Sequence, residues 1–234
     1  MIEAITFDFW NTLYKYPGDK VLHNIRINGF TQVLQSAGFE FEDQAVLDAF
    51  RFAWQHAHRQ QRAYGIELTP RGHMTLILQK LNSTVSEDIW NKAYHYYAET
   101  LLEYPPQLFN DVVETLRLLS SRYKMAVICN TGFNPGRVLR KLMRQDGIMD
   151  FFEYLTFSDE VDCAKPNPRI FDFTLEKINI PSINAAHIGD DMLTDVVGAK
   201  RAGMTAIWLA PDSDWKVPEA DYHLRSLKEL VDLW

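Results

Sequence analysis

The feature that most constrains the fold of this 234-residue chain is the regular alternation of short apolar segments and helical patterns from Pro105 onward. The apolar segments are typical of buried strands, and they span residues 124–129, 154–157, 185–189 and 205–209, with another near Tyr222. Helical patterns are expected at about 110–121, 135–145, 168–178, 192–202 and 226–233. Strands separated by helices favour a parallel, doubly wound α/β sheet. Because the crossovers are right-handed, all the C-terminal strand ends lie at one edge, where ligands bind in such folds.

The N-terminal part of the chain has a different character. Residues 4–9 (AITFDF) are apolar except for Asp8, and we expect them to form a buried strand that ends in a carboxylate. Four successive helical patterns follow, at about 20–37, 43–63, 69–82 and 86–103. We therefore expect residues 1–15 and 104–234 to form the sheet domain and residues 16–103 to form an inserted, all-helical domain.

Composition and charge narrow the class of partner. The net charge of −7 disfavours binding to nucleic acid or to an anionic membrane surface. No run of about 18 apolar residues predicts a membrane-spanning helix, and the N-terminus has no signal-peptide pattern. The two cysteines, Cys129 and Cys163, indicate neither a disulfide framework nor a zinc site. We expect a cytoplasmic protein that would need a local cation to bind an anionic substrate.

Four polar clusters follow the expected strands, and in a parallel sheet they converge on one cleft. They are Asp8-Phe9-Trp10-Asn11-Thr12, Cys129-Asn130-Thr131-Gly132, Lys165-Pro166, and Gly189-Asp190-Asp191 with Asp195. The carboxylates of Asp8, Asp190 and either Asp191 or Asp195 are hard oxygen ligands that suit Mg²⁺. Lys165 would place positive charge opposite the oxygens of a bound phosphate, and the Asn130 backbone N–H could contact the same oxygens. Asp8 would then attack in line and give an aspartyl-phosphate that water hydrolyses.

These clusters resemble the four motifs of the haloacid dehalogenase superfamily, in the same order and over essentially the whole chain. The first motif is an Asp followed four residues later by Thr, here Asp8 and Thr12. The second is a Ser or Thr that commonly precedes Asn, a place held here by Cys129 and Asn130. The third is a Lys often followed by Pro, here Lys165-Pro166, and the fourth is Gly-Asp with a further acid, here Asp190, Asp191 and Asp195.

The resemblance implies a Rossmann-like core, a helical cap formed by the insert, Mg²⁺ as cofactor and covalent catalysis by Asp8. It also implies that the metal is bound by the Asp8 side chain, the backbone carbonyl of Trp10 and Asp190. Asp191 or Asp195 would contribute directly or through water.

Two positions depart from the pattern of the family's phosphatases. Those enzymes carry a second Asp two residues after the nucleophile, and this chain has Trp10 there. An indole cannot transfer a proton near neutral pH, and general acid–base catalysis typically contributes ~10²–10⁴-fold. The loss should affect alkyl phosphates most, because their leaving groups need a proton. Cys129 stands where a hydroxyl would bind the phosphoryl group, and a thiol is a weaker donor that Thr131 would have to replace.

Three functions stay open at this point. The acids favour an Mg²⁺-dependent phosphohydrolase of a small phosphorylated metabolite. Haloacid dehalogenases have an aromatic residue at the position of Trp10, but they use no metal and lack the Gly-Asp-Asp pattern. A degenerate member that binds a phosphate ligand or a partner protein without turnover is the third alternative. The sequence fixes neither the substrate nor the choice between a monomer and a homodimer.

Overall fold

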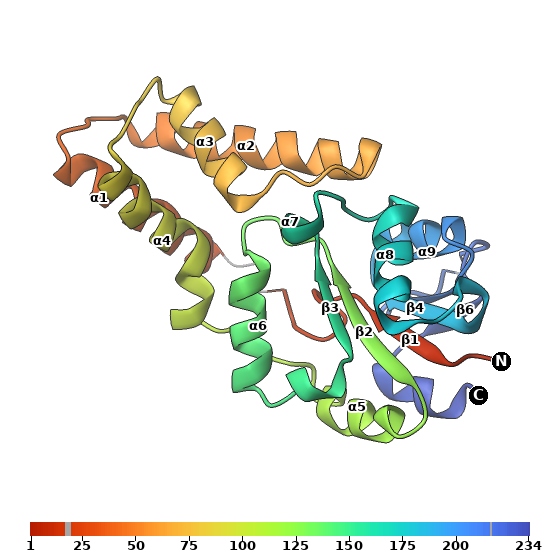
Figure 1. Cartoon of the computed structure of the whole chain (residues 1–234). Coiled ribbons are helices and arrows are strands. Elements are labelled where there is room, and N and C mark those ends of the chain that lie inside the picture. Colours follow the sequence, from red (N-terminus) through yellow and green to blue (C-terminus); the bar gives the residue numbers. More distant parts are fainter. Residues whose placement is uncertain (17–19, 216) are drawn as a thin grey trace.

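A computed structural model describes residues 1–16, 20–215 and 217–234 (Figure 1). Within these ranges one sheet of six strands has the order β3-β2-β1-β4-β5-β6, and all neighbours are parallel. The strands are β1 (Ala4–Phe7), β2 (Lys124–Cys129), β3 (Tyr154–Phe157), β4 (Ala185–Gly189), β5 (Thr205–Leu209) and β6 (Tyr222–Leu224). The α/β fold with a parallel sheet is therefore confirmed.

The central position of β1 explains where the strand ends meet. β1 pairs with β2 on one side and with β4 on the other, so that Phe7 is opposite both Val127 and Ile188. Asp8 follows directly, and its backbone N–H donates to the carbonyl of Ile188 at 2.9 Å. The chain adds β2 and β3 on one side of β1 and then β4, β5 and β6 on the other side. Parallel α/β sheets open a binding crevice at such a switch point.

Helices cover both faces of the sheet, as expected for a doubly wound fold (Figure 1). One apolar cluster joins the sheet to α5 (Val112–Ser120), α6 (Gly136–Gln145), η1 (Met149–Phe151) and η4 (Leu227–Asp232). A second cluster joins the opposite face to α8 (Pro168–Ile178), η3 (Met192–Val197) and α9 (Gly198–Arg201). The short α7 (Ser158–Val161) and η2 (Ser182–Asn184) precede α8 and β4. Successive residues of β2 alternate between the two clusters because strand side chains have a period of two.

Of the five helices between β1 and β2 in the sequence, the first four form the helical insert, residues 20–103. They are α1 (Lys20–Ser36), α2 (Asp43–Tyr64), α3 (Pro70–Lys80) and α4 (Glu87–Glu103). They share their own apolar cluster, which includes Phe30, Phe50, Ile77 and Tyr97, and Phe133 of the sheet domain inserts into it. The C-terminal end of α2 extends toward α8 (Figure 1). The domain boundaries given by the sequence stay a prediction.

Two of the differences from the expected elements place site residues. β1 ends at Phe7 rather than at residue 9, because the amides of Leu13 and Tyr14 both donate to the Phe9 carbonyl and close a turn. The helix expected at 192–202 begins with a wide π turn, η3, in which the Val196 N–H reaches the Asp191 carbonyl at 3.4 Å. Such turns occur often at functional sites. None of the helices in the described ranges combines the length and the apolar character needed to cross a membrane.

Candidate active site

A buried lysine lies between two carboxylates at the C-terminal edge of the sheet. Lys165 Nζ is 2.6 Å from Asp8 Oδ1 and 2.6 Å from Asp195 Oδ1, and Lys165 and Asp195 are each 1% exposed. Burial alone would lower the pKa of Lys165, but the charges of Asp195 and Asp8 raise it above its ordinary value. The ammonium therefore stays charged, and its predicted place opposite a bound phosphate stays a prediction.

Asn130 fixes the backbone of this lysine. Its side-chain Nδ2 donates to the carbonyl of Lys165 at 2.9 Å, and its Oδ1 accepts the Lys165 N–H at 2.8 Å. Asn130 directly follows β2, so the end of β2 sets the position of a residue 35 positions away. The predicted contact of the Asn130 backbone with a phosphate stays a prediction.

The Asp195 carboxylate is fixed by contacts with β4 and with the loop that follows it. Its Oδ1 lies 3.3 Å from His187 Nε2, its Oδ2 accepts the Asp191 N–H at 2.9 Å, and His187 Nδ1 is 2.8 Å from Thr6 Oγ1. A side chain at Gly189 would collide with the Asp195 carboxylate, so this close approach requires glycine. Burial raises the pKa of Asp195, but Lys165 and His187 outweigh it and hold the pKa below its ordinary range. Asp195 is thus ionised and keeps Lys165 in place.

Three carboxylates form a group suited to a metal ion. Asp8, Asp190 and Asp195 each offer one oxygen, and these oxygens lie within 4.8 Å of one another. Burial raises the pKa of Asp8, Lys165 opposes this, and the charges of Asp195 and Asp190 reinforce it. One ammonium does not neutralise three carboxylates, so a bound cation would relieve their repulsion, and an all-oxygen donor set suits a hard cation. Asp195 already accepts hydrogen bonds from protein groups through both of its carboxylate oxygens.

The other predicted metal ligands have different surroundings. Asp191 lies outside this group: its Oδ1 caps η3 by accepting two backbone N–H groups, and its Oδ2 pairs with Arg62 of α2 at 2.6 Å. Trp10 is half-buried, and its ring makes edge contacts with Phe9 and Tyr16. The metal contacts predicted for Asp191 and for the Trp10 carbonyl stay predictions, and the hydrogen bonds of Asp191 do not favour the first.

Cys129 and Thr131 are buried and make contacts within the sheet domain. Cys129 is fully buried in the apolar cluster beside α6, and its Sγ reaches the Asn130 carbonyl at 3.5 Å. Burial raises the pKa of the Cys129 thiol, so it is neutral. The Thr131 N–H donates to Ser158 Oγ at 2.8 Å, and the two hydroxyl oxygens are 3.2 Å apart. These surroundings favour neither side chain as the group that contacts a phosphate.

The sequence gives little sign of the contribution that the helical insert makes to this edge. Gly65, which follows α2, has a φ of 62°, and its carbonyl accepts the Ala164 N–H at 2.9 Å. A side chain at Gly65 would collide with Asn167. Two residues further on, Glu67 accepts hydrogen bonds from Ser158 and, at 2.8 Å, from Gln61. A glycine after a long helix predicts a helix end, but the loop that it touches cannot be inferred from the sequence.

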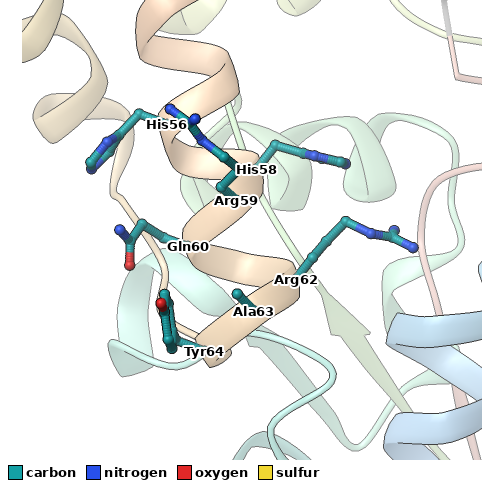
Figure 2. Close-up of a pocket in the computed structure, with 7 residues that line it drawn as sticks. All are labelled: His56, His58, Arg59, Gln60, Arg62, Ala63 and Tyr64. Carbon is teal, nitrogen blue, oxygen red and sulfur yellow. The ribbon is translucent and has the colours of Figure 1, made fainter.

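The end of α2 also carries an open surface pocket (Figure 2). It is lined by His56, His58, Arg59, Gln60, Arg62, Ala63 and Tyr64. The side chains of His58 and Arg62 extend to one side of the helix, whereas Gln60 and Tyr64 extend to the other (Figure 2). All these residues belong to α2, and one of them, Arg62, pairs with Asp191 at 2.6 Å, so one side of the pocket adjoins the loop after β4.

Comparisons with known proteins agree with this geometry. The family described as "Hydrolase: haloacid dehalogenase-like hydrolase" matches residues 2–203. A curated relative, "Glyceraldehyde 3-phosphate phosphatase" from Methanopyrus kandleri, is 28% identical over 242 residues, which cover 100% of this chain and 97% of the relative. The structure of a 2-haloacid dehalogenase from Pseudomonas syringae matches with a TM-score of 0.74 at 20% identity, over 99% of this chain and 97% of that one. A HAD phosphatase from Thermococcus onnurineus matches with a TM-score of 0.69 at 22% identity and the same two coverages. At these identities the two structures share the fold and do not distinguish the two activities.

Proposed function

Because the chain belongs to the haloacid dehalogenase-like hydrolases, we propose that it is an Mg²⁺-dependent phosphohydrolase of a small phosphorylated metabolite with Asp8 as its nucleophile. The observation that carries the proposal is the buried Lys165 ammonium, 2.6 Å from both Asp8 and Asp195, beside a group of three carboxylates. The relative from Methanopyrus kandleri, named for a phosphatase of a small sugar phosphate, supports the substrate class.

The residues at this edge would have separate roles in the reaction. Asp8 and Asp190, with the Trp10 carbonyl and with Asp195 or Asp191, would hold the metal. Bound Mg²⁺ would supply positive charge that offsets the repulsion between carboxylates and phosphoryl oxygens. Lys165 would add a second positive charge at the phosphoryl oxygens, and Asp195 would keep its ammonium beside Asp8.

Asp8 would form a bond to phosphorus while the bond to the leaving-group oxygen breaks, which gives an aspartyl-phosphate. Water would then attack phosphorus, release phosphate and restore the Asp8 carboxylate. Because Trp10 cannot donate a proton, the leaving oxygen would depart as an anion, unless another group protonates it. Acyl and aryl phosphates, whose leaving groups are stable anions, are therefore the substrates that this site suits best.

One observation favours a second candidate. An aromatic residue at the position of Trp10 is a feature of haloacid dehalogenases, which the fold also resembles. The three clustered carboxylates argue against that chemistry, because it needs no metal. Chloride release from chloroacetate in the presence of EDTA would support the dehalogenase and exclude our proposal.

The direct experiment uses beryllofluoride, which mimics the phosphoryl group on an aspartate. We expect ¹⁹F NMR to detect an adduct that needs Mg²⁺ and is missing in Asp8→Asn. We also expect hydrolysis of acetyl phosphate and p-nitrophenyl phosphate that stops with EDTA and in the same variant. Hydrolysis that persists in Asp8→Asn would exclude Asp8 as the nucleophile. Absence of both the adduct and any hydrolysis would favour the degenerate, ligand-binding alternative.

A further inference from the structure

Buried polar atoms without a hydrogen-bond partner gather in the helical insert. Within the described part of the chain they include Arg26 Nε, Glu67 Oε1 and the Tyr97 hydroxyl, and the ring nitrogens of His73 also lack a well-formed bond. Buried polar groups in folded proteins are almost always paired, because leaving them unpaired is costly. A ligand bound among these groups would supply the missing partners and relieve this cost.

Arg26 of α1 is the most unusual member of the cluster. Its side chain is 4% exposed, and its Nη2 donates to Asn134 Oδ1 at 2.9 Å. Its Cζ lies 4.9 Å from the ring centre of Phe133 and 5.9 Å from that of Tyr97. Among the described residues no carboxylate lies within ion-pair distance of it, so the buried charge has no counter-charge there. A guanidinium stays charged at neutral pH, and a neutral amide with two aromatic rings does not repay the loss of its hydration.

The location of Arg26 relates it to the catalytic edge. Phe133 and Asn134 belong to the loop after β2, the same loop in which Asn130 holds Lys165. Burial lowers the pKa of Arg26, the phenols of Tyr97 and Tyr16 act to raise it against this effect, and the Tyr16 ring lies 5.4 Å from the Trp10 ring between centroids. Trp10 is two residues from Asp8. Arg26 therefore contacts the loop that positions Lys165, from the side of the helical insert.

We propose that Arg26, together with Asn134 and the Tyr97 hydroxyl, binds an anionic group on the leaving group of the substrate, either a carboxylate or a second phosphate. The planar guanidinium donates in pairs to such groups, and Tyr97 adds a neutral donor. The substrates would then be small phosphorylated acids or bisphosphates rather than neutral phosphate esters. The inference rests on the proposed function, because it assumes that the phosphoryl group lies at Asp8.

A purely structural role for Arg26 predicts a different outcome for an apolar replacement. If Arg26 only completes the packing of the insert, Arg26→Met lowers the melting temperature. If its charge is reserved for a ligand, methionine removes an uncompensated buried charge and keeps the contacts with Phe133 and Tyr97. The melting temperature of the ligand-free variant then stays equal or rises, because apolar replacements of buried charges are often neutral or stabilising.

The test uses phosphonates, which cannot be hydrolysed, and calorimetric titration of the whole chain with Mg²⁺ present. One arm contains 3-phosphonopropionate and 4-phosphonobutyrate, a second contains their amides, and a third contains ethane-1,2-bisphosphonate. We expect at least one anionic arm to bind about tenfold or more tightly than the amides, because an amide leaves the guanidinium unpaired. The arm that binds more tightly identifies the anion as carboxylate or phosphate.

Variants of Arg26 test whether its side chain produces the selectivity for anions over amides. We expect the ratio between anion and amide affinities to fall toward one in Arg26→Met and to decrease in Arg26→Lys, which keeps the charge without the planar fork. Arg71→Met is the matched control, because Arg71 also lies over an aromatic ring, 4.1 Å from the Trp90 centroid, but is exposed. It should keep the ratio of the unmodified protein.

Three results would overturn the inference: equal affinity of the unmodified protein for acids and amides, an unchanged ratio in both Arg26 variants, or a lowered melting temperature of Arg26→Met. Hydrolysis of acetyl phosphate by the same preparations separates this inference from the proposed function. Anion selectivity without hydrolysis would contradict only the proposed function, and hydrolysis without selectivity would contradict only the role of Arg26.

Discussion

The side-chain amide of Asn130 makes two hydrogen bonds to the backbone of Lys165, one to its carbonyl at 2.9 Å and one from its N–H at 2.8 Å. An amide is the side chain that offers a donor and an acceptor side by side. The direction of the Lys165 side chain, and hence the 2.6 Å contact of its ammonium with Asp8, depends on this pair of bonds.

Asn130→Asp tests that dependence with almost no change in shape. The carboxylate still accepts the Lys165 N–H, but it has no proton to donate to the carbonyl and repels it. A displacement of Lys165 by even a fraction of an ångström should lower kcat on p-nitrophenyl phosphate by about 10- to 100-fold. Asn91→Asp, at an exposed position of α4, is the control. Full activity of a folded Asn130→Asp protein would show that the paired bonds do not position Lys165.

Lys165→Met should be strongly destabilising, because it leaves Asp8 and Asp195 buried without the cation between them. Removing one partner from a buried ion pair typically costs about 3–5 kcal/mol. Urea unfolding in EDTA measures the loss, and adding Asp8→Asn to the variant should recover part of it. Lys200→Met is the matched control: the Lys200–Asp221 pair is about 40% exposed (42% and 37%), and removing it should cost less than about 1 kcal/mol. Equal losses in the two lysine variants would contradict the uncompensated-charge argument.

Most of the fold follows from short-range patterns in the sequence. β2, β3, β4 and β5 have the expected bounds, because buried parallel strands are short apolar runs bounded by polar turns. The π turn of η3 is different, since the residues 192–197 fit a helical pattern equally well. In this turn the Asp195 carboxylate accepts hydrogen bonds from the Asp191 amide and from Lys165, and the second contact, 30 positions away, is not encoded by a local pattern.

The candidate site was predictable in its location more than in its contacts. Parallel strands bring Asp8, Lys165 and Asp190 to one edge, and that much follows from topology. Whether a side chain at a strand end points into the cleft depends on the turn that follows, so the end of the buried strand 124–129 left open whether the Cys129 thiol joins the core or contacts a phosphate. Glu67 and Arg26 lie in a different part of the chain, and their contacts depend on how the insert packs on the sheet.

Glu67 should make the stability of the protein depend on pH. Burial raises the pKa of Glu67 from 4.5 to about 7, against the opposing hydrogen bonds from Ser158 and Gln61. Between these two values the unfolded chain has lost the proton and the folded chain has not, so the free energy of unfolding falls as pH rises and is level above pH 7.

Glu67→Gln removes this titration. At pH 4 the variant should match the unmodified protein, and at pH 8 it should be more stable, by a difference on the order of 3 kcal/mol at most. Urea unfolding at several pH values measures both, and Glu40→Gln, at an exposed position between α1 and α2, is the control. A constant difference between pH 4 and pH 8 would contradict a buried, mostly neutral Glu67.

The ion pair between Arg62 and Asp191 should contribute little to stability although it joins α2 to the loop after β4. Its side chains are 35% and 36% exposed, and such pairs contribute about 0–1 kcal/mol. Asp191 also caps η3, so Asp191→Ala should cost about 1 kcal/mol more than Arg62→Ala. A double-mutant cycle by urea unfolding separates the two effects, and a coupling energy well above about 1 kcal/mol would contradict this ranking.

Trp10→Asp should raise the hydrolysis of alkyl phosphates. The position is two residues from Asp8, and a carboxyl group there can protonate the leaving oxygen, which the indole cannot do. General acid catalysis is worth ~10²–10⁴-fold, so we expect a gain of at least about tenfold on glycerol phosphate after the loss of the indole contacts with Phe9 and Tyr16. Turnover of p-nitrophenyl phosphate, whose leaving group needs no proton, should change little. Trp10→Asn has nearly the same shape as Trp10→Asp and no proton to transfer, so it should not show the gain. Unchanged or lower turnover of glycerol phosphate by a folded Trp10→Asp protein would mean that another group already supplies the proton.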